Sequence, residues 1–457
     1  MKSSTRVIVI ASCVALVLSI SGCGGGSSPV LPPPPHVSGW TWISGANTAG
    51  QSGVYGTQGT ASPSNVPGAR HIGVSWIDKS SNFWLFGGDG RDSTGSFGHL
   101  NDLWKFDGNN WTWVSGANTA NQVGVYGTRG TASSSNVPGA RNFPISWSDG
   151  NGNLWLFGGG GRDSAGTSGG LNDLWKFDGS AWTWVSGANT VNQAGVYGTQ
   201  GTAAPSNVPG ARVGAISWTD SGGNLWLFGG RAFDSFGTFG HINDLWKFDG
   251  SNWTWVSGAN TINQPGVYGT VGAASPSNIP GARQLSATWI DKNGNLWLFG
   301  GDGFDSTGTN NSLNDLWKFD GTNWTWVSGA NTVNQAGVYG AKGTTATSNV
   351  PGARSELVSW TDATGNFWLF GGNGLDSGGT QGNLNDLWKF DGTNWTWISG
   401  ANTVGQPGVY GTLGTISPSN VPGARADAIS GIDSSGNIWL FGGSGPGLLN
   451  DLWRYTP

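Results

Sequence analysis

Short stretches of apolar and polar residues return six times along the chain. In the first copy they cover 71–77, 83–87, 102–106 and 111–114. Asp107-Gly108 separates the last two stretches and is a strong hairpin signal, while 78–82 supplies the turn between the first two. Apolar residues do not persist at spacings of three and four, so the pattern predicts β-strands rather than helices. Each copy is expected to fold as four antiparallel strands.

Three landmarks repeat at an interval of 71 residues. The motif Pro-Gly-Ala-Arg ends at Arg70, Arg141, Arg212, Arg283, Arg354 and Arg425. A Gly-Gly pair begins at Gly87, Gly158, Gly229, Gly300, Gly371 and Gly442. The motif Asn-Asp-Leu-Trp ends at Trp104, Trp175, Trp246, Trp317, Trp388 and, six residues early, Trp453. One repeating architecture can therefore absorb the whole length of the chain.

These landmarks resemble the kelch repeat: an Arg, an aromatic and aliphatic strand ending in Gly-Gly, then Asn-Asp-Leu-Trp-Lys-Phe-Asp and a further Trp. The resemblance covers residues 40–457. It implies an all-β fold, a six-bladed β-propeller of four-stranded antiparallel blades. Kelch repeats have about 50 residues. Each copy here carries an insertion, 115–137 in the first copy, that accounts for the longer interval.

The two ends of the repeat region complement each other. The sixth copy stops after its third strand at Arg454-Tyr455, and Trp40-Thr41-Trp42 precedes the first copy without a partner. In related propellers a strand from one terminus completes the blade begun by the other. We therefore expect 40–43 to close the sixth blade and to remove an exposed sheet edge.

A tryptophan recurs in the first strand of five copies. These residues are Trp76, Trp147, Trp218, Trp289 and Trp360, and Gly431 takes the place in the sixth copy. A row of aromatic side chains can serve as a sugar platform. Rows that repeat in register more often fill the space between blades, and this is the interpretation that we favour.

The composition agrees with a fold made of turns and aromatic-packed strands. The chain has 82 Gly and 29 Trp, with only 10% charged residues, whereas Gly is roughly 7% of an average protein. The 21 Lys and Arg stand against 26 Asp and Glu. Binding to nucleic acid needs a basic surface, so a nucleic-acid partner is not expected.

The N-terminus has the pattern of a targeting segment. Lys2 and Arg6 precede an apolar stretch at 7–20, which is too short to span a bilayer comfortably. Ile20-Ser21-Gly22-Cys23 resembles the lipobox of bacterial lipoproteins. This resemblance implies a signal peptide at 1–22 and an acylated Cys23. An ordinary signal peptide with a chance cysteine is the alternative.

A Gly/Ser/Pro-rich tether at 23–39 would then join the lipid to the propeller at 40–457. The expected location is the bacterial cell envelope. The protein would be anchored to a membrane through Cys23, with the outer membrane the first choice, and would face the periplasm or the surface.

Strand parity places the loops of the repeat. Because strand direction alternates, the loop after the second strand and the loop after the fourth emerge on the same side. That side carries the 88–101 type loops and the 115–137 type insertions, and we call it the long-loop face. Binding residues are disproportionately on loops, so function is expected on this face.

Two sets of repeated polar residues have structural explanations. The six Arg of Pro-Gly-Ala-Arg could form a cationic ring at the channel mouth, but six Asp of Asn-Asp-Leu-Trp match them one for one, which favours ion pairs. A second set of Asp residues lies in the long loops: Asp92, Asp163, Asp234, Asp305 and Asp376. They could bind calcium, although an Asp that bonds its own turn explains them more simply. No other metal or cofactor is expected.

Specificity is sought where the copies differ on the long-loop face. Just after the repeating Arg stand His71, Asn142, Gln284, Glu356 and Asp427. In the neighbouring loops stand Arg91, Arg162, Arg231, Phe233 and Phe304. We expect these residues to line a shallow, asymmetric ligand-binding pocket over the channel. Neutral variation at exposed positions is the alternative.

The resemblance also brings two enzyme classes. Galactose oxidase carries its chemistry on a kelch-type propeller and needs copper held by two His and two Tyr, one of them cross-linked to a Cys. Here Cys13 and Cys23 are the only cysteines, and the four His form no ligand cluster by spacing. Copper-radical oxidation is therefore not expected.

Sugar epimerases and mutarotases need only an acid and a base in a pocket. Glu356 is the only Glu, and three Asp fall outside the repeating sets: Asp89, Asp302 and Asp427. A pair drawn from Glu356, Asp427 and His71 could serve as this acid and base.

The sequence favours a binding module, with a polysaccharide as the first choice of ligand and a protein as the second. A carbohydrate-active enzyme and a purely structural envelope protein are the alternatives.

Overall fold

The structure, a computed structural model, describes residues 38–457. The expected signal peptide at 1–22, the acylation site Cys23 and most of the tether at 23–39 lie outside the described residues. Within the described part every regular element is a β-strand, beginning with β1 (Gly39–Ser44). That part contains no helix long and apolar enough to cross a membrane.

The first copy folds as an antiparallel sheet around β4 (Phe83–Arg91). On one side β4 pairs with β3 (Val74–Ile77), and on the other with β5 (Phe97–Phe106). β6 (Trp111–Ser115) lies outermost beside β5, and the short β2 (Arg70–His71) pairs with the far end of β4. The four apolar residues that open β4 are buried on both faces of the sheet. Phe83 and Leu85 pack toward the sixth copy, and Trp84 and Phe86 toward the second, as the alternation of side chains along a strand requires.

The other copies repeat this arrangement. The second copy contains β7 (Arg141–Asn142), β8 (Ile145–Ser148), β9 (Leu154–Arg162), β10 (Ser168–Phe177) and β11 (Trp182–Ser186). The third contains β12 (Arg212–Val213), β13 (Ile216–Thr219), β14 (Leu225–Phe228), β15 (Arg231–Phe233), β16 (Phe239–His241), β17 (Leu245–Phe248) and β18 (Trp253–Ser257). The fourth contains β19 (Ala274–Ser275), β20 (Arg283–Gln284), β21 (Ala287–Ile290), β22 (Leu296–Phe304), β23 (Asn310–Phe319) and β24 (Trp324–Ser328). The fifth contains β25 (Arg354–Ser355), β26 (Val358–Thr361), β27 (Phe367–Phe370), β28 (Asn373–Leu375), β29 (Gln381–Asn383), β30 (Leu387–Phe390) and β31 (Trp395–Ser399).

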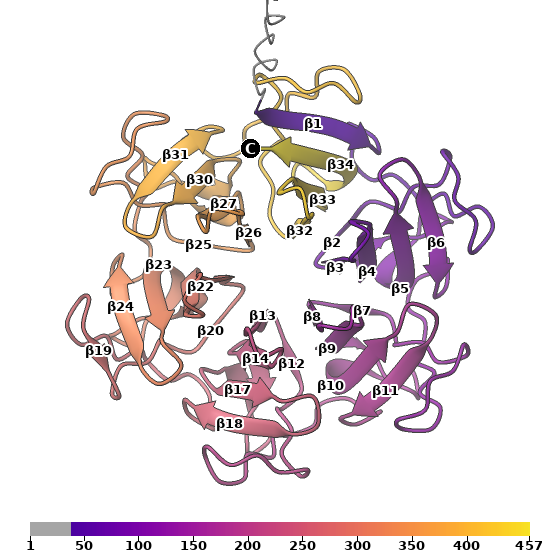
Figure 1. The fold of residues 1–457 in the computed structure, drawn as a ribbon, viewed down its shortest axis with the longest axis horizontal. Helices are drawn as coiled ribbons and strands as arrows, with labels where there is room; N and C mark the ends of the chain where they lie inside the picture. The colour runs from indigo at the N-terminus through magenta and orange to yellow at the C-terminus, as the bar shows by residue number, and fades with distance from the viewer. Residues whose placement is uncertain (1–37) are drawn as a thin grey trace, which may run out of the picture. The chain divides into compact units, whose positions relative to one another are not determined.

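The sheets of the six copies stand around a central channel as the blades of a β-propeller (Figure 1), and in the third and fifth copies the hairpin extension forms a separate small sheet. The sixth blade is built from β32 (Ile429–Ile432), β33 (Ile438–Ser444), β34 (Leu448–Thr456) and β1, in the sheet order β1-β34-β33-β32. Trp40 pairs with Tyr455, and Trp42 with Trp453. The expected closure by the N-terminal strand is confirmed, and so is the all-β propeller fold.

Two strand boundaries differ from the sequence-based expectation. The first strand, expected at 71–77, is broken at Ile72, whose φ of 51° departs from β geometry. The second and third strands are longer than expected, because Gly88–Arg91 pairs with Phe97–Leu100 as a continuation of the β4–β5 ladder. Most of the segment expected as a loop at 88–101 is therefore hairpin, and its turn is short.

The repeated Gly-Gly pair marks an irregularity in this ladder. The register between β4 and β5 shifts between Phe86 and Gly88. Gly88 has a φ of 92°, and a Cβ there would lie 2.4 Å from the carbonyl oxygen of His71. Only glycine allows β2 to approach β4 this closely.

The repeated tryptophans of the first strand lie between blades, as expected. Trp76 packs in one core cluster with Leu154 and Trp175 of the second blade. Its indole Nε1 donates to the carbonyl oxygen of Trp147, 3.1 Å away.

The repeated Arg and Asp residues form buried ion pairs rather than an open cationic ring. Arg70 donates to both carboxylate oxygens of Asp102, at 2.6 and 2.7 Å, and neither side chain is exposed. The hydroxyl of Tyr55 and the indole of Trp104 also donate to Asp102, at 2.6 and 2.7 Å. The same pair occurs in all six blades, at Arg70, Arg141, Arg212, Arg283, Arg354 and Arg425.

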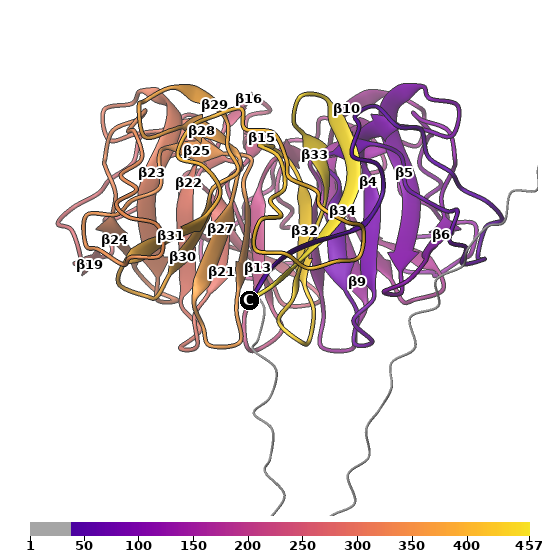
Figure 2. The ribbon, with the colours of Figure 1, turned by 90° about the horizontal axis from the view of Figure 1, so that it is seen from above.

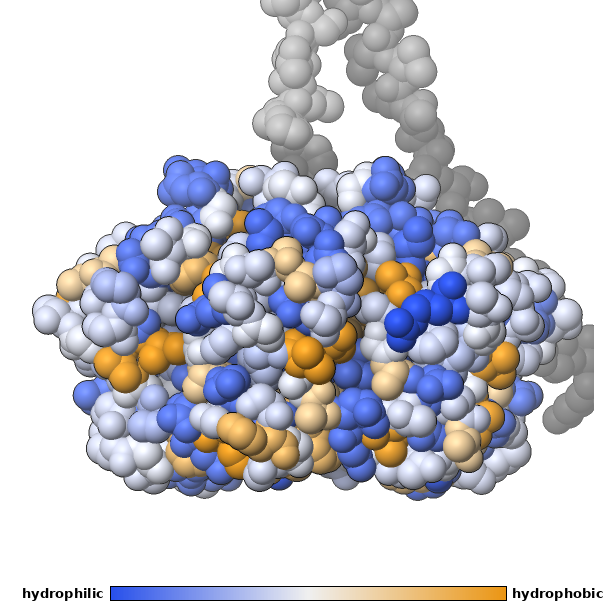
Figure 3. Space-filling view, turned by 90° about the horizontal axis from the view of Figure 1, so that it is seen from below, coloured by the Kyte–Doolittle hydropathy of each residue, from blue (hydrophilic) through white to orange (hydrophobic). Residues whose placement is uncertain are grey.

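The two rims of the ring differ. Figure 2 shows the hairpin extensions such as β15–β16 and β28–β29 at one rim, the upper one in that view, while short turns close the strands at the other. The outer wall in Figure 3 carries small, separate hydrophobic patches among polar side chains. Isolated apolar residues of this kind are normal for a protein surface, so the part of the wall in this view does not single out a binding site.

Candidate functional site at the channel mouth

Six residues close the mouth of the channel as a ring of backbone hydrogen bonds. They stand two positions after each repeating Arg: Ile72, Phe143, Gly214, Leu285, Glu356 and Asp427. Each N–H donates to the carbonyl oxygen of the ring residue in the preceding blade, over distances of 2.9 to 3.3 Å, and Ile72 completes the circle by donating to Asp427. All six have positive φ values between 47° and 62°. Such values are unusual for residues other than glycine and persist where the surroundings impose them.

The ring surrounds a cavity of about 170 Å³, which Glu356 and Asp427 also line. These two acids are neighbours in the ring, and the N–H of Asp427 donates to the carbonyl oxygen of Glu356 at 2.9 Å. Across the junction with the first blade, His71 Nδ1 lies 3.4 Å from Asp427 Oδ2. The three residues that the sequence offered as a possible acid–base set are therefore close together.

Electrostatics in the ring favours the protonated form of the acids. Burial, followed by the charge of Asp427, raises the pKa of Glu356 to about 7, while His71 acts in the opposite direction. Burial also raises the pKa of Asp427, and the hydrogen bonding and charge of His71 oppose the rise. Because the two acids interact, their protons belong to the pair rather than to one residue. A carboxyl group that titrates near neutral pH can donate or accept a proton under physiological conditions.

A second carboxylate–histidine pair lies in the first blade, next to the second. Asp89 in β4 is paired across the ladder with His99 in β5, and His99 Nδ1 contacts Asp89 Oδ1. From the second blade, the Asn142 amide donates to Asp89 Oδ2 at 2.9 Å. Burial raises the pKa of Asp89, but these hydrogen bonds outweigh it and hold the pKa below its ordinary value.

A third pair joins the third and fourth blades. His241 Nε2 lies 3.4 Å from Asp302 Oδ2, and the Gln284 amide donates to the same oxygen at 3.1 Å. The imidazole of His241 lowers the pKa of Asp302 against the effect of burial, and the Gln284 amide adds to the lowering. This carboxylate is thus held ionised, as is Asp89, while Glu356 holds its proton to higher pH.

Seven side chains that break the repeat therefore gather at one end of the channel. They are the four carboxylates outside the repeating sets and the three histidines of the described chain: Asp89, Asp302, Glu356, Asp427, His71, His99 and His241. Asp89, His99, Asp302 and His241 were not among the sequence-based site residues. Asp89 and Asp302 stand outside the repeating sets of Asp residues, and this could have marked them as site residues. Nothing in the sequence indicated that His99 and His241 would lie beside them.

A groove with aromatic walls adjoins this cluster between the second and third blades. Its volume is about 400 Å³, and its lining includes His99, Asn142, Phe233 and Phe239. The two phenyl rings lie 5.0 Å apart. The groove is open because the second blade has glycine where the first has Asp89 and His99, at the paired positions Gly160 and Gly170.

The remaining predicted site residues have contacts of their own. Arg91 and Arg162 each donate to a carbonyl oxygen of their own hairpin turn, at Gly95 and Gly166, both at 2.9 Å. Arg231 stands over the ring of Phe239 at 5.0 Å and is exposed. Phe304 meets His241 edge to face, with centroids 5.9 Å apart.

The Asp residues of the long loops are bonded within the fold. Asp92 Oδ1 accepts from the N–H groups of Thr94 and Ser96, and Oδ2 accepts from the N–H of Ala120 at 3.0 Å. Oδ1 of the other four Asp likewise accepts from an N–H of its own turn, as expected for an Asp that bonds its own turn.

The described residues do not fit a copper-radical centre. Six Tyr hydroxyls that might serve as ligands donate instead to the repeated Asp carboxylates, as Tyr55 does to Asp102. Residues 38–457 contain no Cys for a cross-link, and no three His, Cys, Asp or Glu side chains in this range are placed to hold a metal ion.

No family model matches the chain, and no curated protein matches it. Among solved structures, the chain is similar to one titled "Structure of YjhT", with 13% identity and a TM-score of 0.50 over 85% of this chain and 95% of that one. It also matches a structure titled "Novel fungal alcohol oxidase with catalytic diversity among the AA5 family, in complex with copper". That match has 13% identity and a TM-score of 0.45, over 88% of this chain and 77% of the other. At this identity the first likeness shows the β-propeller fold alone.

Proposed function

We propose that the protein is a membrane-tethered, extracytoplasmic binding module that holds a polysaccharide at the channel mouth. The observation that carries the proposal is the convergence of the non-repeating carboxylates and the histidines on one side of the ring. Side chains that repeat in every blade are explained by the fold. The repeat does not explain why the side chains that differ between blades lie close together, and a bound ligand would.

The chemistry of the channel mouth suits a ligand rich in hydroxyl groups. Carboxylates accept hydrogen bonds from sugar hydroxyls, and the amides of Asn142 and Gln284 can both donate and accept. The phenyl rings of Phe233 and Phe239 offer a surface on which a sugar ring can stack. The groove of about 400 Å³ falls within the usual range for ligand sites, roughly 300–1,000 Å³.

A glycan array tests the proposal directly. The full chain should bind a subset of glycans, and a variant carrying Asp89→Asn, Asp302→Asn and Phe233→Ala should lose at least tenfold in affinity. The matched control is Lys292→Ala, an exposed residue in a tight turn away from the hairpin extensions. If the chain binds no glycan, the polysaccharide proposal fails. If the triple variant binds as well as the control, the placement at the channel mouth fails.

The tether requires its own test, because residues 1–37 are outside the described part of the chain. Cys23→Ala should move the protein from the membrane fraction to the soluble fraction of the producing cells. Unchanged partitioning would contradict acylation at Cys23.

Proton transfer on a bound sugar is a second candidate function, favoured by the raised pKa of Glu356 beside Asp427. Protonated Glu356 can give its proton to a ring oxygen, while an ionised carboxylate takes the proton of the anomeric hydroxyl as the ring opens. Glu356→Gln should then abolish anomer exchange, followed by NMR on any sugar that binds, while glycan binding is retained. Equal exchange rates in both proteins would exclude this role.

A further inference from the structure

The sixth blade lacks a loop that the other five share. Between its Gly-Gly pair and its Asn-Asp-Leu-Trp motif, Pro446 stands where the first blade has the residues 91–97. The shortened hairpin is closed by a hydrogen bond from the N–H of Gly445 to the carbonyl oxygen of Gly447, at 3.0 Å. The missing segment includes the repeated Asp-Ser pair.

In the other blades this Asp-Ser pair joins the insertion that precedes the blade to the insertion that follows it. In the first blade the carbonyl oxygen of Asp92 accepts from the N–H of Gly53 at 3.1 Å, and the N–H of Ser93 donates to the carbonyl oxygen of Asn118 at 3.0 Å. Both bonds recur in all five blades that have the pair. The carboxylate adds a third bond, because Asp92 Oδ2 accepts from the N–H of Ala120 at 3.0 Å. This third bond recurs in the fourth and fifth blades.

The sixth blade still has the three backbone groups that bond to the Asp-Ser pair in other blades, and we call them the receiving groups. By the repeat they are the N–H of Gly408, the carbonyl oxygen of Asn47 and the N–H of Ala49. Within residues 38–457 none of these three groups has a hydrogen-bond partner. Gly408 is partly exposed, whereas its five counterparts are buried: Gly53, Gly124, Gly195, Gly266 and Gly337.

The frame around these groups keeps the geometry of an intact blade. The N–H of Ala46 donates to Asn450 Oδ1 at 3.1 Å, as the N–H of Ala117 donates to Asn101 Oδ1 at 3.1 Å in the first blade. The N–H of Gly50 donates to the carbonyl oxygen of Leu448 at 2.7 Å, which matches the bond from Asn121 to His99. Beside Gly408, the N–H of Val409 donates to the carbonyl oxygen of Val421 at 2.8 Å, as the N–H of Val54 donates to that of Val66 at 2.8 Å. The receiving groups are thus flanked by the same hydrogen bonds as in a blade where an Asp-Ser pair is bound.

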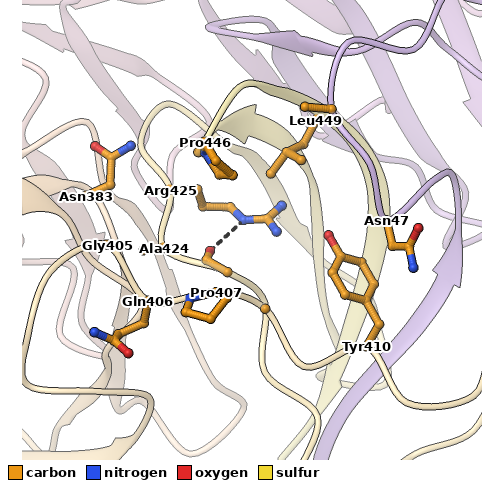
Figure 4. A pocket seen from close by; sticks show the side chains of 14 residues that line it. Asn47, Asn383, Gly405, Gln406, Pro407, Tyr410, Ala424, Arg425, Pro446 and Leu449 are labelled. Carbon is orange, nitrogen blue, oxygen red and sulfur yellow. Dashed lines mark hydrogen bonds between the residues drawn. The ribbon is translucent and has the colours of Figure 1, made fainter.

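The missing loop leaves a cavity of about 670 Å³, which we call the blade-6 notch (Figure 4). Its lining includes Asn47, Gly408, Tyr410, Pro446 and Leu449. The tyrosine ring is partly exposed here, while its counterparts in the other blades are buried. The volume lies within the usual range of ligand sites, roughly 300–1,000 Å³.

We propose that the blade-6 notch binds an Asp-Ser turn of a partner polypeptide. Such a turn would supply one carbonyl oxygen, one carboxylate and one N–H to the three groups that lack partners, as the chain's own turns do in the first, fourth and fifth blades. Residues 1–37 contain no Asp, so the N-terminal segment of the chain cannot provide the carboxylate. The Asp-Ser turns of a second copy are already bound within their own blades. The occupant is therefore a different protein with an exposed Asp-Ser turn.

Calorimetric titration of the full chain with a synthetic peptide tests this inference. The peptide has the sequence of residues 92–97, Asp-Ser-Thr-Gly-Ser-Phe, with both ends blocked. One peptide should bind per chain, and replacing its Asp by Asn should weaken binding at least tenfold, because the carboxylate bond is charge-assisted. An absence of binding, or equal binding of the Asn peptide, would overturn the proposal.

Two variants locate the peptide. Replacing Pro446 by the seven residues at 91–97 should fill the notch, abolish peptide binding and raise the melting temperature. Ala49→Pro removes one receiving N–H, and should remove the preference for the Asp peptide over the Asn peptide while native near-ultraviolet circular dichroism is retained. Unchanged peptide binding in the filled variant would place the peptide elsewhere and overturn the proposal. Glycan binding at the channel mouth should be the same in all of these proteins, so the two proposals can fail separately.

Discussion

Carboxylates at two places in this propeller have opposite surroundings. Asp102 and its five repeats are fully buried, and both oxygens of Asp102 accept short hydrogen bonds from Arg70, Tyr55 and Trp104. At the channel mouth Asp427 is 11% exposed and has one histidine at 3.4 Å. Glu356 has no side-chain hydrogen bond to any residue in 38–457. The first kind of carboxylate has no capacity left for a ligand, and the second kind has.

Carboxylates thus have two roles in this chain: some stabilise the fold in buried ion pairs, and others are available to a ligand. A buried ion pair is weak evidence for net stability, but removing one partner leaves an unpaired buried charge. A carboxylate whose partners are few and partly solvated has a smaller effect on stability. Its removal should instead lower the affinity for a ligand.

The largest expected effect is on the repeated pairs. Asp173→Ala in the second blade leaves Arg141 buried without its carboxylate, and should lower the free energy of unfolding by about 3–5 kcal/mol. Urea denaturation followed by tryptophan fluorescence measures the change. The matched substitution at the channel mouth, Asp302→Ala, should cost less, about 1–2 kcal/mol, because it removes the contacts to Gln284 and His241 at a partly exposed site. Similar losses for the two variants would remove the distinction between the two kinds of carboxylate.

An intermediate effect is expected from the titration of Glu356. The folded chain holds the proton of Glu356 up to a pKa of about 7, above the ordinary value of 4.5. Between these values the folded state binds more protons than the unfolded state, so this contribution to stability is complete at low pH and is lost as pH rises through 7. From pH 4.5 to pH 8 the wild type should lose about 1–3 kcal/mol relative to Glu356→Gln. A pH-independent difference between the two proteins would contradict the raised pKa.

The pKa itself can be read without resonance assignment, because Glu356 is the only glutamate in the chain. Glutamate labelled with ¹³C at the side-chain carboxyl should give one NMR signal that titrates near pH 7. Asp427→Asn removes a neighbouring charge that raises this pKa, and should shift the midpoint to lower pH. A midpoint near 4.5 in the wild type would show that the ring does not bury this carboxyl group.

The smallest effect on stability is expected at the amides that approach the channel-mouth carboxylates. Asn142→Ala removes one hydrogen bond to Asp89, and should change the free energy of unfolding by about 0.5–1.5 kcal/mol. It should also raise the pKa of Asp89, because that hydrogen bond helps to lower it. Thermal unfolding at pH 7 and a carboxyl titration by NMR check the two effects. If Asn142→Ala lowers the free energy of unfolding as much as Asp173→Ala does, Asp89 belongs with the carboxylates that stabilise the fold.

The sequence by itself determined the blades and how the ring closes. The 71-residue interval, the hairpin signals and the unmatched Trp40-Thr41-Trp42 were sufficient, because strand pairing within a blade is local and the closing strand is the one element left over. The matched number of Arg and Asp residues also predicted their ion pairs, since each pair recurs at a fixed separation within most copies.

The tertiary structure alone decided which unrepeated side chains meet. Asp89 meets His99 because the hairpin extends beyond the strands that the pattern indicated, and Asp427 meets His71 because the ring brings the last blade to the first. The raised pKa of Glu356 likewise depends on burial in the ring. The six-residue shortening of the last blade was visible in the sequence, but only the structure shows that Asn47, Ala49 and Gly408 stay around the blade-6 notch with backbone groups that lack partners in 38–457. Contacts between blades depend on the closed ring, which places equivalent positions of different copies within hydrogen-bonding distance.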